Sequence, residues 1–238
     1  MTGTKGNILT MKKWTTEAIG DWVVYKNNQL IAFNKPAGLP VQSDRTGDKS
    51  LLELAEIYTK GQLELIHRLD RPASGLILLA KNKKALAHLN EQFRDRSIQK
   101  TYLAVVQKKP QPAQGTLEHY LLRDGRTNRS RAVAPQTPGA KHARLTYKYM
   151  GSSDAYHLLR VQLLTGRHHQ IRAQLSAMNW FIKGDVKYGA RRKNPDRSIH
   201  LHAWQIGFKH PVSGENQELV APLPAEDPVW AFFADQLS

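Results

Sequence analysis

The alternation of apolar and polar positions predicts several strands in the first half of the chain. Residues 63–67 alternate like a half-buried strand, whereas residues 75–80 form a short apolar run typical of a strand buried on both faces. Two apolar segments, residues 22–26 and 30–34, are separated by three polar residues and predict a hairpin. Residues 100–106 are rich in β-forming residues and predict a central strand.

Helical spacing of apolar residues predicts two helices in the same half. Ser50 and Glu53 form a capping box, and the helix that follows them has one apolar face, made of Leu51, Leu54, Ala55 and Tyr58. A second helix is expected from about residue 83 to residue 94, with Asn82 as its N-cap. The first of these helices is expected to be scaffold.

The second half begins with a turn-rich stretch, residues 108–142, in which several prolines and glycines mark turns. Strands are then predicted over residues 143–150, 156–164, 199–208 and 217–220, with a short closing helix around residues 229–233. Between the second and third of these strands the chain is expected to turn into a helix after residue 165. His168 and Arg172 would share one face of that helix.

Composition and charge narrow the class of protein. The chain has 238 residues, 35 Lys and Arg against 20 Asp and Glu, a formal net charge of +15, and no cysteine. A disulfide framework and a cysteine nucleophile are therefore excluded, and a basic protein of this kind usually has a polyanionic partner. No stretch reaches the roughly 18 apolar residues of a membrane span, and no signal peptide is evident, so a soluble, cytoplasmic protein is expected.

The domain organisation expected from this pattern is simple. Residues 1–13 are polar and basic without periodicity, which indicates a mobile N-terminal lead-in. Residues 14–238 are long enough to bury a substantial core and are expected to form a single catalytic domain.

An aspartate between two arginines is the most unusual chemical feature of the chain. Asp70 follows Arg68 and precedes Arg71 in a Pro/Ala/Ser/Gly turn that leads into the apolar run. The arginines favour the ionised carboxylate, and such an anion can attack an electrophilic carbon and leave again. Asp70 is therefore the candidate nucleophile. On the residues alone, the commoner role of such an aspartate is to cap a turn and pair with an arginine.

The sequence around Asp70 resembles the active-site motif of the RluA-type RNA pseudouridine synthases. The resemblance rests on His67-Arg68-Leu69-Asp70, Ser74-Gly75-Leu76 and Leu79-Ala80-Lys81-Asn82. Further blocks match in order over roughly residues 22–224: Asn34-Lys35-Pro36-Ala37-Gly38, Lys100-Thr101-Tyr102-Leu103-Ala104, Thr165-Gly166-Arg167-His168-His169-Gln170-Ile171-Arg172, Gly184-Asp185 with Tyr188-Gly189, and Leu201-His202-Ala203 with Phe208 and His210-Pro211.

The resemblance implies three catalytic residues. Asp70 would be the nucleophile, Tyr102 would pack against the target base and take part in removing the C5 proton, and Arg172 would pair with Asp70. Arg68 would help to fill the space left by an extruded base, and Ile171 and His169 would bind the substrate. On composition alone, Tyr102 would be a core tyrosine and Arg172 a surface arginine.

The resemblance also implies a fold and a reaction. The fold is α+β, a large mixed and mostly antiparallel sheet with a central active-site cleft and peripheral helices, which agrees with the strand-rich pattern. The reaction is isomerisation of specific uridines in ribosomal or transfer RNA, extruded from a loop or bulge. Attack on the ribose C1′ by Asp70 and elimination there remain alternatives. No cofactor is required, and a monomer without an obligate protein partner is expected.

Two basic clusters suit an RNA partner. Residues 120–150 contain seven Lys and Arg against one acid, and residues 183–197 repeat the pattern. A charge run is usually a solvated face, but arginines at this spacing in an exposed, turn-rich insertion suit RNA phosphates. The candidate RNA-binding residues are Arg123, Arg126, Arg129, Arg131, Arg191 and Arg192.

Two departures from the family pattern and two alternatives complete the interpretation. Ala73 and Gln174 replace a common Thr and a common His, and neither is the nucleophile. One alternative is a metal-dependent hydrolase, in which His200 and His202 on one strand face would bind a metal with His168, His169 and Asp70. The other is an RNA-binding protein that keeps the fold without catalysis.

Overall fold

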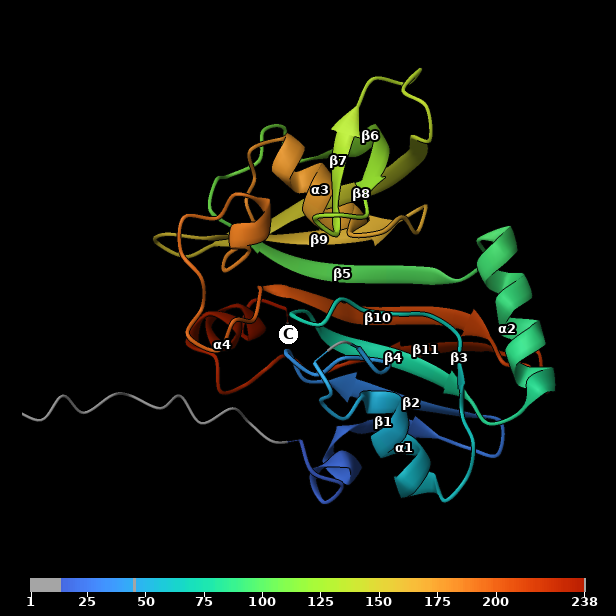
Figure 1. Ribbon diagram of the computed structural model, residues 1–238. Coiled ribbons are helices and arrows are strands. Elements are labelled where there is room, and N and C mark those ends of the chain that lie inside the picture. The colour runs from blue at the N-terminus through green and yellow to red at the C-terminus, as the bar shows by residue number, and fades with distance from the viewer. Residues whose placement is uncertain (1–13, 45, 238) are drawn as a thin grey trace, which may run out of the picture.

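A mixed eleven-stranded sheet forms the frame of the molecule (Figure 1). The computed structural model describes residues 14–44 and 46–237, so the predicted lead-in, residues 1–13, lies outside the described residues. The strands are β1 Val23–Lys26, β2 Leu30–Lys35, β3 Glu64–Leu65, β4 Ser74–Ala80, β5 Gln99–Val106, β6 Gln114–Asp124, β7 Arg129–Val133, β8 Lys141–Ser152, β9 His157–Leu163, β10 Leu201–Lys209 and β11 Asn216–Val220.

The strand order places β4, from the first third of the chain, beside β10, from its last fifth, in the interior of the sheet. The order is β1-β2-β4-β10-β5-β9-β8-β6-β7, with β3 paired to β4 and β11 paired to β10. Within the described residues, β10 and β4 are the one parallel pair of named strands, in the register His202 with Ser74 and Ala203 with Gly75. The large, mostly antiparallel sheet confirms the expected α+β fold.

Strand β4 is buried along its whole length, as the apolar run predicts. Leu76 and Leu78 face the cluster that β5 and helix α2 (Lys83–Asp95) share, whereas Ile77 and Leu79 face the cluster beneath helix α1 (Leu51–Thr59). The hairpin prediction is also confirmed, because β1 and β2 pair antiparallel. The predicted strand over residues 63–67 is shortened to β3, whose two residues pair with the far end of β4.

The helices lie at the periphery of the sheet. They are α1 Leu51–Thr59, α2 Lys83–Asp95, α3 Gln170–Ala177 and α4 Pro228–Ala234, with 3-10 turns η1 Ala18–Trp22 and η2 Val186–Tyr188. The capping box of α1 and the Asn82 cap of α2 are both present. Tyr58, expected on the buried face of α1, is instead 37% exposed. Its ring lies at the surface, with the Lys26 ammonium 4.9 Å from the ring centre. None of the described helices could cross a bilayer.

Two sequence predictions in the second half need correction. The turn-rich stretch, residues 108–142, contains the long strand β6 and the strand β7, which form a hairpin along β8. The alternation of Leu117 and Leu121, both buried, was masked by outward-facing polar residues and flanking prolines. Helix α3 begins only at Gln170, so His168 precedes it and shares no helical face with Arg172.

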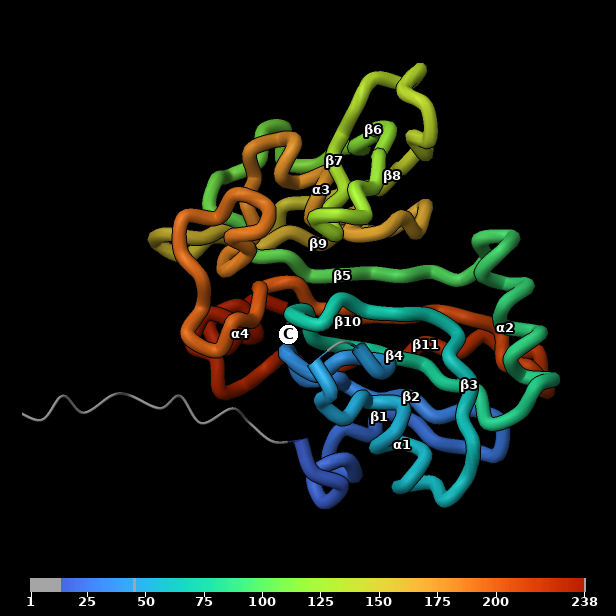
Figure 2. Tube along the Cα trace, in the orientation of Figure 1, coloured from blue at the N-terminus to red at the C-terminus, as the bar shows by residue number. Residues whose placement is uncertain are grey.

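The parallel pairing of β4 with β10 determines where the functional residues meet. The segments that lead into two parallel strands lie at the same end of the sheet. One of them is the Asp70 loop, and the other is the chain between β9 and β10, which carries α3 and η2 before it returns to the sheet centre (Figure 2). The Ile199 N–H donates to the Pro72 carbonyl at 3.0 Å and joins the two segments.

Candidate active site

The loop between β3 and β4 presents Asp70 beside the sheet centre. The Ala73 N–H donates to the Asp70 carbonyl at 3.0 Å, which closes a tight turn, and the Gly38 N–H donates to the Arg71 carbonyl at 2.7 Å. These backbone hydrogen bonds hold the loop in place. The Asp70 side chain itself is 24% exposed and so remains accessible from solvent.

Arg172 of helix α3 joins Asp70 to a second carboxylate. Its Nη1 donates to Asp70 Oδ2 at 2.8 Å, while its Nε and Nη2 donate to the two oxygens of Asp185 at 2.7 and 2.8 Å. The Arg172 side chain is 4% exposed and that of Asp185 is 1% exposed. Arg172 is therefore not the surface arginine that composition alone predicts, because its burial is balanced by two anionic partners.

The electrostatics of this triad keep the guanidinium charged. Burial alone would lower the pKa of Arg172, but the hydrogen bonds and charge of Asp185, followed by those of Asp70, raise the pKa well above its ordinary value. A planar fork with all three of these donors engaged cannot rotate freely. Asp185 thus fixes the orientation of the Arg172 guanidinium, and the guanidinium in turn fixes the position of one carboxylate oxygen of Asp70.

His169 lies on the other side of Asp70. Its Nε2 is 3.7 Å from Asp70 Oδ1, and its Nδ1 is hydrogen-bonded to the Tyr188 hydroxyl at 2.8 Å. Burial, then the charge of Arg172, lowers the pKa of His169 to about 2, so this contact joins a neutral imidazole to a carboxylate. His169 also has a left-handed backbone, φ 50°, immediately before α3, a conformation that non-glycine residues adopt at a cost.

Tyr102 and Ile171 line the apolar side of the site. Both are buried in the main hydrophobic cluster, Tyr102 on β5 and Ile171 on α3. Burial, then the charge of Asp70, raises the pKa of Tyr102 far above its ordinary value, so its hydroxyl keeps its proton at neutral pH.

The two arginines that flank Asp70 have different environments. Arg68 is exposed on the loop. Arg71 points away from Asp70 and pairs with Asp44 and Asp48, and its Nε also donates to the Gly38 carbonyl at 2.9 Å. The ion pairs of Arg71 are thus made with these two acids, and the expectation that Arg71 supports the Asp70 anion stays a prediction. The arginine that contacts Asp70 comes instead from a helix 102 positions later in the sequence.

Lys35 is fully buried behind the Asp70 loop. Its ammonium donates to the carbonyls of Pro36 and Leu39, each at 2.9 Å, and of Arg71 at 3.2 Å. Burial lowers the pKa of Lys35 to about 7, against the opposing influence of the nearby Asp70 charge. Lys35 therefore ties the end of β2 to the backbone of the residue that follows Asp70.

The histidines proposed for a metal site have other partners. His200 precedes β10, and its Nε2 contacts the Asp227 carboxylate at 3.0 Å, whereas His202 contacts the Ser74 hydroxyl at 2.8 Å. Within residues 14–44 and 46–237, no group of three or more potential ligand side chains is placed to hold a metal ion. The hydrolase alternative therefore loses the ligand cluster on which it depends.

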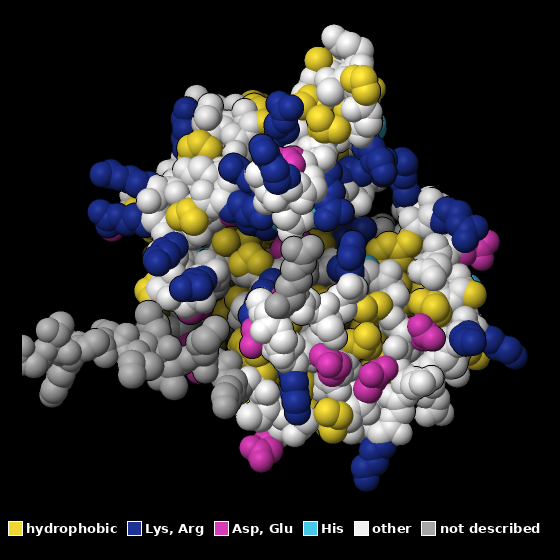
Figure 3. All heavy atoms as spheres, viewed as in Figure 1, with side chains coloured by type: hydrophobic (Ala, Val, Ile, Leu, Met, Phe, Trp, Pro, Cys, Tyr) yellow, Lys and Arg dark blue, Asp and Glu magenta, His cyan; other side chains and the backbone are white. Residues whose placement is uncertain are grey.

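The six candidate RNA-binding arginines are all exposed and fall in two places. Arg123, Arg126, Arg129 and Arg131 lie on the β6–β7 hairpin, and Arg191 and Arg192 lie on the loop after η2. Lys and Arg side chains gather on the upper part of the molecule, around this hairpin, while the lower part of the same face carries more acidic side chains (Figure 3). Arg123 is close enough to lower the pKa of His168 and of His169.

Comparison with known proteins identifies the class. A model of the RNA pseudouridylate synthase family matches residues 29–177, more than half of the chain. The chain belongs to this family, which confirms the resemblance that the sequence blocks predict.

The relatives include proteins with and without an assigned target. An uncharacterised RNA pseudouridine synthase of Chloroflexus aurantiacus is 38% identical over 202 residues, which cover 81% of this chain and 63% of the relative. Ribosomal large subunit pseudouridine synthase C of Vibrio vulnificus is 31% identical over 211 residues, 85% of this chain and 66% of the relative. The aligned region thus spans about two thirds of the length of these relatives.

Two solved human structures share the fold. Human RNA pseudouridylate synthase domain containing 4 superposes with a TM-score of 0.74 and 26% identity, covering 93% of this chain and 95% of that chain. Domain containing 1 gives a TM-score of 0.72 and 26% identity, with 87% and 86% covered.

Sequence reasoning did not include Asp185, Tyr188 and Lys35 among the site residues. Each lies in a block that was matched to the family, so the signal was present. What the sequence lacked was the information that these blocks converge, because the contacts form between different elements and loops, 13 to 36 positions apart.

Proposed function

We propose that this protein is an RNA pseudouridine synthase that isomerises specific uridines in structured ribosomal or transfer RNA. The observation that carries the proposal is the Asp70–Arg172–Asp185 triad, which leaves one carboxylate oxygen accessible at the centre of the fold of this family. Membership in the family supports the reaction class. The isomerisation requires the base to be detached at N1, turned and rejoined through C5.

Asp70 would act on the ribose of the extruded uridine. Arg172 occupies Oδ2, so Oδ1 is the oxygen that faces the substrate, with the neutral His169 at its side. Oδ1 would attack C1′, or Asp70 would promote elimination there. In both routes the fixed orientation of the carboxylate lowers the barrier, because a reactive group held in place avoids the entropic cost of finding its geometry.

The detached base would be retained by Tyr102 and Ile171. Their burial provides a dry, apolar wall against which a flat base can pack while it turns. The protonated Tyr102 hydroxyl would take part in the transfer of the C5 proton as a hydrogen-bonding relay. Exposed Arg68, two residues before Asp70, would fill the space that the extruded nucleotide leaves in the RNA.

The organisation of the enzyme follows from the same proposal. Because a single sheet runs from β1 to β7, residues 14–238 would act as one catalytic domain. A monomer without an obligate protein partner stays the expectation from the sequence. Its RNA substrates would place it in the cytoplasm.

Tritium release from RNA labelled at uridine C5 tests this function directly. Total RNA from a strain that lacks the gene is incubated with the wild type, Asp70→Asn and Asp154→Asn, a control in the exposed turn after β8. The wild type and Asp154→Asn should release tritium, whereas Asp70→Asn should be slower by at least roughly a thousandfold. Intact RNA binding without release by the wild type would instead support the non-catalytic RNA-binding alternative.

A further inference from the structure

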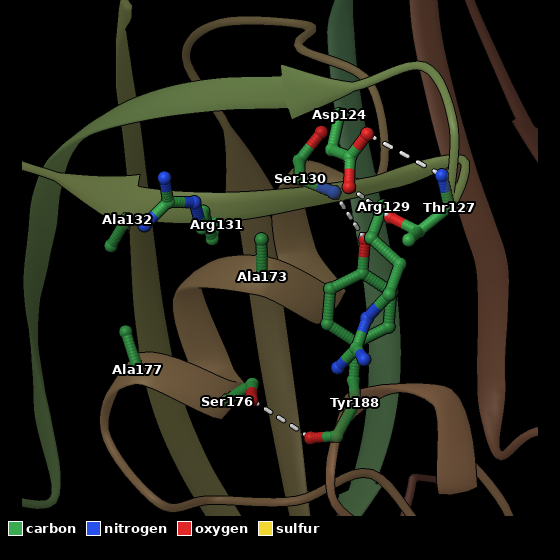
Figure 4. A pocket seen from close by; sticks show the side chains of 10 residues that line it. All are labelled: Asp124, Thr127, Arg129, Ser130, Arg131, Ala132, Ala173, Ser176, Ala177 and Tyr188. Carbon is green, nitrogen blue, oxygen red and sulfur yellow. Dashed lines mark hydrogen bonds between the residues drawn. The ribbon is translucent and has the colours of Figure 1, made fainter. Parts of the chain in front are cut away.

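A groove of about 480 Å³ lies between strand β7 and helix α3, a volume within the usual range of about 300–1,000 Å³ for ligand sites (Figure 4). Ala173, Ser176 and Ala177 point into it from one side of α3, and Ala132 and Arg131 line it from β7. The side chains that α3 presents to the groove are small, so the space between helix and strand is not filled by the protein.

The groove shares one residue with the candidate active site. Tyr188 forms its end wall, and the Tyr188 hydroxyl contacts His169 Nδ1 and accepts the Ser130 N–H, both at 2.8 Å. The Arg172 guanidinium carbon lies 4.7 Å from the centre of the Tyr188 ring. A ligand in the groove would therefore lie one side chain away from the residues that hold Asp70.

The rim of the groove is cationic. The Arg129 guanidinium lies 5.4 Å from the Tyr188 ring centre, and Arg131 follows two positions later on the same strand. Asp124 is the one carboxylate among the described lining residues, and it is engaged in the β6–β7 turn by the Arg126 N–H and the Thr127 hydroxyl. The groove therefore offers free positive charge at its edge and apolar surface within.

These features together match the chemistry of a nucleotide. Small side chains let a flat base approach the helix, a guanidinium plane held over an aromatic ring can stack on that base, and exposed arginines can contact its phosphate. We propose that the groove binds an unstacked nucleotide that neighbours the target uridine in the RNA strand. The proposal rests on the proposed function and adds a second site of base recognition to it.

The test makes two separate changes: a substitution in the protein fills the groove, and a change in the RNA removes the neighbouring base. Ala177→Trp places an indole in the groove, and Ala87→Trp on the exposed face of α2 is the matched control. Both are made in an Asp70→Asn background, so that RNA affinity is measured without turnover. The probe is a synthetic stem-loop that carries one C5-labelled uridine from which the wild type releases tritium. Variants of this stem-loop lack the base at each of the two nucleotides on either side.

At one of these positions, loss of the base should weaken binding to the Asp70→Asn protein on the order of tenfold, because the stacking of that base is removed. Ala177→Trp should weaken binding of the intact RNA to a similar extent and be insensitive to the missing base at that position. Ala87→Trp should behave like its parent. Equal base-removal effects in the filled and unfilled proteins, with thermal unfolding unchanged, would overturn the groove assignment.

Failure of the proposed function is distinguishable from failure of the groove. If the proposed function is wrong, the wild type releases no tritium from any RNA. If the groove assignment is wrong, Ala177→Trp and removal of the base affect RNA binding independently of each other.

Discussion

At the scale of single residues, two carboxylates share one cation. Asp185 takes two of the Arg172 nitrogens and is almost fully buried, whereas Asp70 takes one and is partly exposed. The buried carboxylate therefore orients the guanidinium, and the exposed one keeps a free oxygen for chemistry. The pairing differs from the sequence expectation only in that the orienting partner was not foreseen.

Asp185→Asn removes the charge that balances Arg172 inside the protein. We expect the free energy of unfolding to fall by about 3 kcal/mol, because one partner of a buried ion pair is removed while the other stays buried. Urea unfolding measures this, and Asp154→Asn, an exposed acid, should change it by no more than about 0.5 kcal/mol. A decrease in the free energy of unfolding as small as that of the control would mean that Asp185 does not stabilise the buried Arg172 guanidinium.

At the scale of elements, the junction between β4 and β10 holds the site together. Gly75 has φ +114°, and a Cβ there would overlap the backbone of Ala203 across the parallel pair. His202 of β10 is fully buried and contacts the Ser74 hydroxyl of β4 at 2.8 Å. Both strands begin beside the Asp70 loop, so a disturbance here would displace Asp70.

Gly75→Ala should therefore destabilise the protein much more than a similar change in the partner strand β10. We expect a loss of about 3 kcal/mol or failure to fold, since a left-handed backbone and a clash with backbone atoms must both be relieved. Gly207→Ala is the control, because the nearest atom to its added Cβ is 3.6 Å away. Thermal unfolding of the two variants should differ clearly, and equal melting temperatures would contradict the junction's importance.

Burial lowers the pKa of His202 from 6.5 in the unfolded chain to about 4, so the unfolded state binds more protons between these values. Stability should therefore decrease as the pH falls through this window, by up to about 1.4 kcal/mol per pH unit for each such histidine. His67 and His169, with pKa values of about 3 and about 2, act in the same direction.

The test of this pH dependence compares urea unfolding of the wild type and His202→Gln between pH 7.5 and pH 4.5. The free energy of unfolding of the variant should depend less steeply on pH, and the difference in slope should correspond to about one bound proton. An unchanged slope would mean that His202 is not held neutral in the folded protein.

At the scale of the whole molecule, the net charge is concentrated in one part of the chain. Residues 99–198 contain 19 Lys and Arg against 5 Asp and Glu, whereas the remaining residues contain 16 against 15. These residues form β5 to β9, α3 and η2, so the basic character belongs to one half of the sheet. A polyanion would be oriented by this asymmetry before it reaches Asp70.

Replacing Arg123, Arg126 and Arg131 by Gln should weaken RNA binding for all sequences and make it less dependent on salt. The slope of log affinity against log salt should fall by about 0.7 for each phosphate that the protein no longer neutralises. A control variant with Lys26, Lys49 and Lys60 replaced by Gln carries the same charge change in the other half. Equal slopes of log affinity against log salt for the two variants would mean that the arginines of the β6–β7 hairpin do not contact RNA phosphates.

Local features of the fold were predictable from the sequence, which also named a set of candidate site residues. The capping box of α1, the doubly buried β4 and the β1–β2 hairpin depend on neighbours within a few residues, which a periodic pattern records. The family blocks pointed to Asp70, Tyr102 and Arg172, although their catalytic roles stay predictions. Strand β6 was missed because its exposed side chains and flanking prolines resemble a loop.

The sequence by itself determined most of the elements and the chemical groups, because propensity, periodicity and residue type are local properties. Only the tertiary structure decided which groups meet: that Arg172 rather than Arg71 contacts Asp70, that Asp185 holds Arg172, and that the alanines of α3 leave a groove beside Tyr188. These contacts join different elements and loops, from 13 to 102 positions apart along the chain. Their geometry follows from the register of β4 with β10 and from packing, which no single stretch of residues encodes.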